Sequence, residues 1–198
     1  MNDLDVTLQC VVAALVKATV RFHLTGGLAS SLYGEPRFTQ DIDVVVDCAS
    51  RGTTAATFVD ALSEEFLLSE EAVIEAVRTG QMFQAIHRET VMKVDFHTRP
   101  RIPGELDRSV KRQFMEGLEV PVVSKEDAVL SKLLWIQQGS EKSRQDVLGI
   151  LMSPGDIDTA YLGEAARDLG VHQLLTELQD LADPNGQGGG NGESTPDS

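Results

Sequence analysis

Apolar residues near the start of the chain recur at helical spacing. Within residues 4–20 the apolar positions include Leu8, Val11, Val12, Leu15 and Val16. Side chains at this spacing share one face of a helix, so the segment is predicted to be an amphipathic helix. Residues 22–25 form a short candidate strand, and residues 28–33 resemble the start of a helix. Residues 42–47 are rich in β-branched side chains and are predicted to be a strand.

The next part of the chain alternates between helical and strand-like patterns. Residues 54–66 and 70–78 are predicted to be helices. Residues 81–87 and 91–97 alternate polar and apolar side chains, which indicates two strands joined by the polar turn Arg88-Glu89-Thr90. A further short strand is predicted at residues 119–123.

From residue 124 onward the pattern is helical. Ser124, three residues before Asp127, is suited to cap a helix that runs to about Gln138. Helices are also predicted at 141–152, 158–169 and 171–181. The glycine-rich, polar end lacks an apolar anchor and is predicted to be disordered. The expected organisation is an α/β part at 1–123, a helical subdomain at 124–182 and a tail at 183–198.

The charge balance limits the class of partner. The net charge is −14, with 24% charged and 41% hydrophobic residues, a composition that is ordinary for a soluble globular protein. Proteins that bind long nucleic acid usually have a basic surface, because phosphate neutralisation supplies most of the non-specific affinity. A role in coating long DNA is therefore not expected, whereas a local basic patch remains compatible with a small folded RNA.

The cysteines and the N-terminus indicate a cytoplasmic protein. Cys10 and Cys48 lie in apolar sequence and form no CxxC pair, so we expect reduced core thiols. The first ten residues contain two acids and no base, unlike a signal peptide. The longest apolar stretch near them, residues 11–16, is far shorter than the roughly 20 residues of a membrane span. No membrane partner is expected.

Two adjacent glycines follow the first predicted strand. Gly26 and Gly27 allow backbone N–H groups to approach a phosphate closely, and a helix N-terminus adds partial positive charge. Glycine pairs before helices are also common tight turns, so this feature alone leaves both interpretations open.

Three aspartates add a second candidate feature. Asp41 and Asp43 stand two apart in a predicted strand, so both carboxylates face the same side. Two like charges in an apolar strand repel each other, and a divalent cation such as Mg²⁺ relieves this repulsion. Asp95 lies in another predicted strand, and the three carboxylates converge if the two strands are neighbours. The alternative is that these acids are merely exposed strand residues.

Other common catalytic patterns are absent from the sequence. The chain contains neither a GxxxxGK[ST] phosphate-binding loop nor a GxSxG nucleophile elbow. His23, His87 and His172 show no metal-ligand spacing along the chain. His97 lies on the same strand face as Asp95, and we expect a structural role or a position at the rim of the site.

The glycines and aspartates together resemble a known superfamily. Gly26-Gly27, a gap of 13 residues, Asp41-Ile42-Asp43 and a later strand with Asp95 are similar to the signature of DNA polymerase beta-like nucleotidyltransferases. The resemblance implies an α/β (α+β) nucleotidyltransferase fold, a small mixed sheet flanked by helices with a C-terminal helical subdomain.

Two further segments resemble one branch of that superfamily. The branch contains the nucleotidyltransferase toxins of abortive-infection and toxin–antitoxin systems and the small antibiotic nucleotidyltransferases. Its Arg-x-Thr-x-Asp-Ile-Asp pattern is matched by residues 37–43, beginning at Arg37. Its helical motif resembles the segment that carries Lys132, Arg144 and Asp146. The likeness covers roughly residues 20–150.

The resemblance implies a role for each residue. Asp41, Asp43 and Asp95 would hold two Mg²⁺ ions (or Mn²⁺), and Asp95 would also help to deprotonate the acceptor. Gly26, Gly27 and Ser30 would cradle the phosphates of a nucleoside triphosphate such as ATP. Arg37 and Lys132 would neutralise the triphosphate, unless they are solvated surface charges. Asp146 would orient Lys132 or contact the sugar, unless it only favours a helix dipole.

The expected activity is metal-dependent transfer of a nucleoside monophosphate from the triphosphate to a hydroxyl. The acceptor is tRNA or a protein in a toxin-like enzyme, which a cognate antitoxin would regulate. The alternative acceptor is a small aminoglycoside or lincosamide antibiotic. A degenerate, non-catalytic domain that binds a nucleotide or a protein is a second alternative, although all three carboxylates are present.

Overall fold

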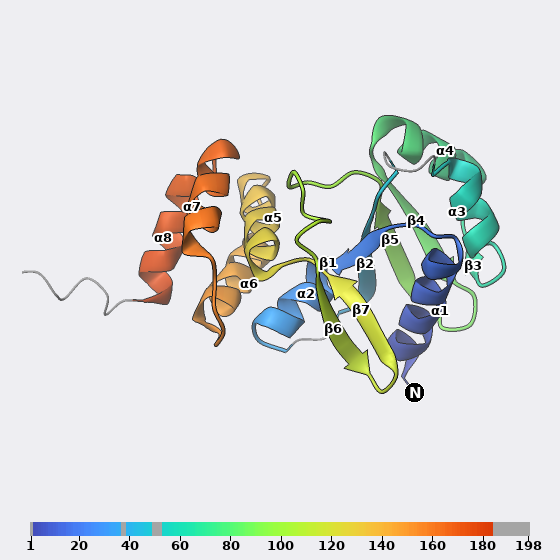
Figure 1. The fold of residues 1–198 in the computed structure, drawn as a ribbon, viewed down its shortest axis with the longest axis horizontal. Coiled ribbons are helices and arrows are strands. Elements are labelled where there is room, and N and C mark those ends of the chain that lie inside the picture. The colour runs from blue at the N-terminus through green and yellow to red at the C-terminus, as the bar shows by residue number, and fades with distance from the viewer. Residues whose placement is uncertain (1, 37–38, 49–52, 184–198) are drawn as a thin grey trace, which may run out of the picture.

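A computed structural model describes residues 2–36, 39–48 and 53–183 of the protein. Within these residues the chain forms eight helices and seven strands, and all the strands join one mixed sheet (Figure 1). None of the helices in these ranges combines the length and the apolar character needed to cross a membrane. The mixed α/β fold class predicted from the sequence is confirmed.

The sheet brings together strands that are far apart in the chain. Its order is β3-β4-β5-β2-β1-β7-β6, with parallel pairing between β2 and β5 and between β1 and β7. The other neighbours are antiparallel. The strands are β1 Phe22–Thr25, β2 Asp41–Val46, β3 Phe66–Leu67, β4 Met82–His87, β5 Lys93–His97, β6 Val110–Met115 and β7 Leu118–Val122.

The helices gather at the two ends of the molecule. Figure 1 shows α5 to α8 grouped at one end and α1, α3 and α4 at the other, with α2 beside the centre of the sheet. The helices are α1 Asp3–Lys17, α2 Gly26–Tyr33, α3 Ala55–Leu62, α4 Glu70–Thr79, α5 Lys125–Gln137, α6 Glu141–Met152, α7 Thr159–Asp168 and α8 His172–Ala182.

Aromatic packing holds one face of the sheet against α3. Phe83 of β4 stacks on Phe96 of β5 with ring centroids 4.8 Å apart, and Phe58 of α3 meets Phe83 edge-on at 5.5 Å. All three side chains are buried, as are Ile42 and Val44 of β2. Because strand side chains alternate between faces, burying these residues turns Asp41, Asp43 and Asp95 to the opposite face.

Most predicted elements are present, and the differences have local causes. The helix predicted at 54–66 ends at Leu62, and β3 begins at Phe66. Strand β6 was missed because its Val-Lys-Arg-Gln-Phe-Met sequence is largely polar, as suits a half-exposed strand at the sheet edge. Nearly all of the predicted disordered tail, residues 184–198, lies outside the described residues. The division at residue 123 stays a prediction.

Candidate active site

The three aspartates lie on one face of two paired strands. Strands β2 and β5 run parallel, with Asp43 directly opposite Asp95. Asp41 lies two residues before Asp43 in β2, so it faces the same side of the sheet. All three side chains are half-buried, and their strand neighbours Ile42, Val44, Val94 and Phe96 are fully buried on the other face. The strand pairing that carboxylate convergence requires is therefore present.

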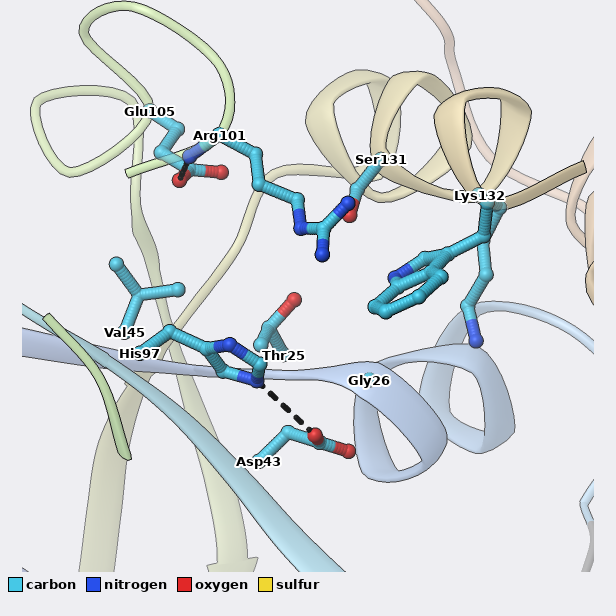
Figure 2. A pocket seen from close by; sticks show the side chains of 10 residues that line it. Thr25, Gly26, Asp43, Val45, His97, Arg101, Glu105, Ser131 and Lys132 are labelled. Carbon is cyan, nitrogen blue, oxygen red and sulfur yellow. Dashed lines mark hydrogen bonds and ion pairs between the residues drawn. The ribbon is translucent and has the colours of Figure 1, made fainter. Parts of the chain in front are cut away.

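A different neighbour binds each of these carboxylates. Thr39 donates a hydrogen bond from Oγ1 to Asp41 Oδ1 at 3.0 Å. His97 Nε2 lies 3.2 Å from Asp43 Oδ1, the contact drawn as a dashed line in Figure 2. Gln84 Nε2 donates to Asp95 Oδ1 at 2.7 Å. Among the described residues, the three carboxylates do not form a group of ligand atoms that all lie within 4.8 Å of one another.

Asp43 is held in its ionised form. Burial alone would raise the pKa of this carboxyl, because charge is poorly solvated in the interior. The hydrogen bond and charge of His97, the backbone N–H of Gly27 and the charge of Lys132 outweigh that effect, and the pKa of Asp43 lies below its ordinary value. A carboxylate that stays charged in a half-buried position is suited to bind a cation.

Gly26 allows the backbone to pass against Asp43. Strand β1 ends at Thr25, and Gly26 begins α2 with a φ of +60°, in the left-handed region. A Cβ on Gly26 would overlap the Asp43 carboxylate and lie 2.7 Å from the Asp43 Cβ. The Gly27 N–H points toward Asp43 Oδ2 at 3.5 Å. Glycine is required at position 26 because any larger residue would both strain the backbone and displace the carboxylate.

A buried ion pair joins α5 to α6 next to α2. Lys132 of α5 donates from Nζ to Asp146 Oδ2 of α6 at 2.7 Å, and both side chains are largely buried. Ser30 of α2 donates to the backbone oxygen of Gly26 at 3.0 Å and contacts Asp146 at 3.3 Å. Figure 2 shows the Lys132 side chain extending toward the start of α2. Three predicted residues, Lys132, Ser30 and Asp146, therefore meet next to Gly26.

Several residues that the sequence analysis did not assign to the site also line its cavity. Thr25, Val45, Arg101, Glu105, Ser131 and Trp135 line it together with Gly26, Asp43, His97 and Lys132 (Figure 2). The Arg101 guanidinium lies over the Trp135 ring, 3.9 Å from its centroid. Trp135 stands three residues after Lys132 in α5. In the sequence, only this spacing indicated that the two side chains share a helix face.

Glu105 adds a buried acid beside Arg101. Its carboxylate accepts a hydrogen bond from the Arg101 backbone N–H at 2.7 Å, and the residue is 2% exposed. Burial raises the pKa of Glu105 to about 7, and the charge of Asp127 adds to this effect, although the bond from Arg101 opposes it. The cavity therefore contains an acid that titrates near neutral pH.

The structure does not bring every predicted residue to the cavity. Arg144 of α6 pairs with Glu177 of α8 at 2.7 Å, which places its guanidinium between two helices outside the cavity. Arg37 lies outside the described residues.

The comparisons with known proteins agree with this geometry. A sequence profile of the nucleotidyl transferase AbiEii toxin family, type IV toxin–antitoxin system, matches residues 10–175. No curated protein matches the chain. An antigenic nucleotidyltransferase-like protein from Paracoccidioides brasiliensis has a similar structure, with 21% identity, a TM-score of 0.53 and coverage of 88% of this chain and 91% of that one.

An antibiotic-modifying enzyme is a more distant structural neighbour. The lincomycin-bound lincosamide adenylyltransferase LnuA is 16% identical with a TM-score of 0.44, over 72% of this chain and 93% of that one. The predicted nucleotidyltransferase fold is confirmed by the fungal structure, and the family profile extends over most of the sequence. The chain belongs to the AbiEii family of nucleotidyl transferase toxins of type IV toxin–antitoxin systems.

Proposed function

We propose that the protein transfers a nucleoside monophosphate from a nucleoside triphosphate to a hydroxyl acceptor, with Mg²⁺ held by Asp41, Asp43 and Asp95. The observation that carries this proposal is the parallel register that sets Asp43 against Asp95. The three carboxylates share one face of the sheet, and Asp43 packs against Gly26 at the N-terminus of α2, the end of a helix that favours bound anions.

The donor set suits a hard divalent cation. Mg²⁺ prefers carboxylate oxygens together with substrate phosphates, and all three side chains offer only oxygen. Asp43 is held ionised, so it is ready to bind without losing a proton. Two such ions, or Mn²⁺ in their place, would supply Lewis-acid stabilisation of the attacking and leaving oxygens. Ligation requires the three carboxylates to come closer together than they lie in this structure.

Residues of α2 and α5 bind the phosphates in this proposal. The N–H groups at Gly26 and Gly27 and the partial positive charge of the α2 N-terminus attract the triphosphate. Lys132 lines the same cavity and supplies a full positive charge, which Asp146 orients through the 2.7 Å contact. Ser30 supports this arrangement from α2 through its hydrogen bonds to Gly26 and Asp146.

Asp95 accepts the proton of the acceptor hydroxyl. Its carboxylate retains an oxygen other than the one bound to Gln84, and general bases act at hydrogen-bond distance. His97 holds Asp43 in position through the 3.2 Å contact, so its role is to orient a ligand rather than to react.

Family membership favours tRNA or a protein as the acceptor, and a cognate antitoxin as the regulatory partner. The overall charge of −14 disfavours long nucleic acid and is compatible with a small folded RNA or a protein.

Transfer of label from each of four α-³²P ribonucleoside triphosphates tests the proposal. The protein is incubated with Mg²⁺ and either total tRNA or a proteome extract, and labelled products are separated by gel electrophoresis. We expect label from at least one donor in RNA or in protein. Asp43→Asn and Asp95→Asn should each reduce transfer by at least about a hundredfold, because the metal and the base are lost.

Asp180→Asn serves as the matched control, since Asp180 is an exposed acid on α8, remote from the cavity. Its transfer activity should equal that of the unmodified protein. Label that persists in Asp43→Asn and Asp95→Asn would refute the catalytic assignment. Binding of Mg²⁺ and nucleotide without transfer to either macromolecule would redirect the search to small-molecule acceptors, and absence of binding would reject the enzyme proposal.

A further inference from the structure

A second cluster of ligating side chains lies away from the candidate active site. The Cys10 thiol of α1, the Glu65 carboxylate just before β3 and the His87 imidazole at the end of β4 offer ligand atoms that all lie within 4.8 Å of one another. In the β4–β5 ladder, Gln84 lies opposite Asp95 and shares its face. His87, three residues further on, faces the other side of the sheet.

A hydrogen-bond relay fixes the tautomer of His87. Thr7 donates from Oγ1 to the Asp3 backbone oxygen at 2.8 Å, so its hydroxyl accepts the 2.6 Å bond from Thr90. Thr90 has then used its only hydroxyl proton, and its oxygen must accept the 3.0 Å bond from His87 Nδ1–H. A longer contact, from the Thr90 backbone N–H to the same Nδ1 at 3.3 Å, opposes this tautomer, but the three shorter bonds outweigh it.

The relay leaves the second ring nitrogen of His87 as a free lone pair. His87 is 1% exposed, and its Nε2 has no hydrogen-bond partner among the residues that the structure describes. A buried nitrogen without a partner is destabilising, and such groups call for an explanation such as an ion. Histidines that bind metals show the same arrangement, with one ring nitrogen donating to a neighbour and the other bound to the metal.

The surroundings of Cys10 are electronegative. The Glu65 carboxylate belongs to the same cluster, and Glu89 follows two residues after His87. A divalent cation neutralises this negative charge and stabilises a thiolate.

We propose that Cys10, Glu65 and His87 form a zinc-binding site that is separate from the proposed magnesium site. One sulfur, one imidazole nitrogen and one carboxylate oxygen match the ligands of Zn²⁺ and not those of Mg²⁺. Ligand atoms around tetrahedral zinc lie about 3.5 Å apart, so the exposed Glu65 side chain closes the remaining distance. Water completes the coordination.

Zinc at this position cross-links three segments of the chain. It ties α1 to the edge of the sheet formed by β3 and β4, in addition to the hydrogen bond between Thr7 and Thr90. Because the folded protein presents the three ligands together, zinc binding stabilises it relative to the unfolded chain. The proposal concerns stability and metal content, so it does not depend on the transferase activity.

Metal binding is measured on the full chain after removal of bound metal with a chelator. Co²⁺ is added first, in excess Mg²⁺ to occupy any carboxylate site, and the near-ultraviolet absorption from thiolate to cobalt is recorded. Zn²⁺ is then titrated to displace the cobalt. We expect one cobalt per chain with thiolate absorption, and its displacement by zinc.

Cys10→Ser and Glu65→Gln test the ligands, and Cys48→Ser is the matched control because Cys48 is the other free cysteine. The thiolate band should vanish in Cys10→Ser and persist in Cys48→Ser. Thr90→Val removes the relay to His87 and should weaken zinc binding by about 10–100-fold. Circular dichroism checks that each variant is folded.

Either of two results would overturn the proposal. One is an unmodified protein that takes up no thiolate-bound cobalt, and the other is a Cys10→Ser variant that binds zinc as tightly as the unmodified protein.

Discussion

Replacing Gly26 by alanine tests whether the position of Asp43 requires glycine at the start of α2. Gly26 has a φ of +60°, and left-handed backbone costs an ordinary L-residue about 1–2 kcal/mol. The added Cβ would also lie 2.7 Å from the Asp43 Cβ and overlap its carboxylate. Asp43 must move, and losing its hydrogen bond to His97 costs about 1.5–3 kcal/mol more, as expected for a bond to a charged group.

Gly117→Ala separates these two contributions. Gly117 has a φ of +79° in the turn between β6 and β7, and a Cβ there would have no neighbour within 4 Å. Its substitution should therefore show the backbone cost alone. Urea unfolding should give a free-energy loss of about 2.5–5 kcal/mol for Gly26→Ala and about 1–2 kcal/mol for Gly117→Ala.

The transfer assay completes this comparison. Gly26→Ala should lose activity because Asp43 is displaced, whereas Gly117→Ala should retain it. Equal free-energy losses in the two variants, together with full activity in Gly26→Ala, would refute the argument that Asp43 requires glycine at this position.

Three further predictions concern the same cavity. Lys132→Met should lower the free energy of unfolding by about 3 kcal/mol in urea titrations, because it removes one partner of a buried ion pair; an unchanged midpoint would contradict this. The pKa of Glu105, raised by burial to about 7 from 4.5, means that the folded state favours the protonated acid. The contribution of Glu105 to the free energy of unfolding should thus be greatest below about pH 4.5, and about 3 kcal/mol of it should be lost as the pH rises through 7. Unfolding titrations across this pH range should show that Glu105→Gln abolishes the loss. Trp135 is the single tryptophan, so adding Mg²⁺ and nucleotide should change its fluorescence, and Asp43→Asn should suppress the change.

Local patterns in the sequence were sufficient for much of the site. The period of two along a strand places Asp41 and Asp43 on one face, whatever the rest of the fold does. The glycine pair after a short strand predicted a turn into a helix, and Gly26 begins α2. These predictions succeeded because they depend on backbone geometry over a few residues.

The approach of Asp95 was decided by the tertiary structure. Its strand pairs with β2 although α3, β3, α4 and β4 lie between the two strands in the chain, and the parallel register buries Val94 and Phe96 beside Ile42 and Val44. Register is set by which side chains are buried, and a shift of one residue would turn Asp95 to the opposite face.

The remaining contacts depend on segments that only folding brings together. Arg101 and Trp135 are 34 positions apart, and no local pattern connects them. Cys10, Glu65 and His87 show no ligand spacing along the chain, yet Cys10 of α1 lies where β3 begins and β4 ends. The sequence by itself determined most of the elements and the faces of their side chains, because both follow from short-range backbone geometry. The tertiary structure alone decided which faces meet, because that choice depends on packing among residues distant in the chain.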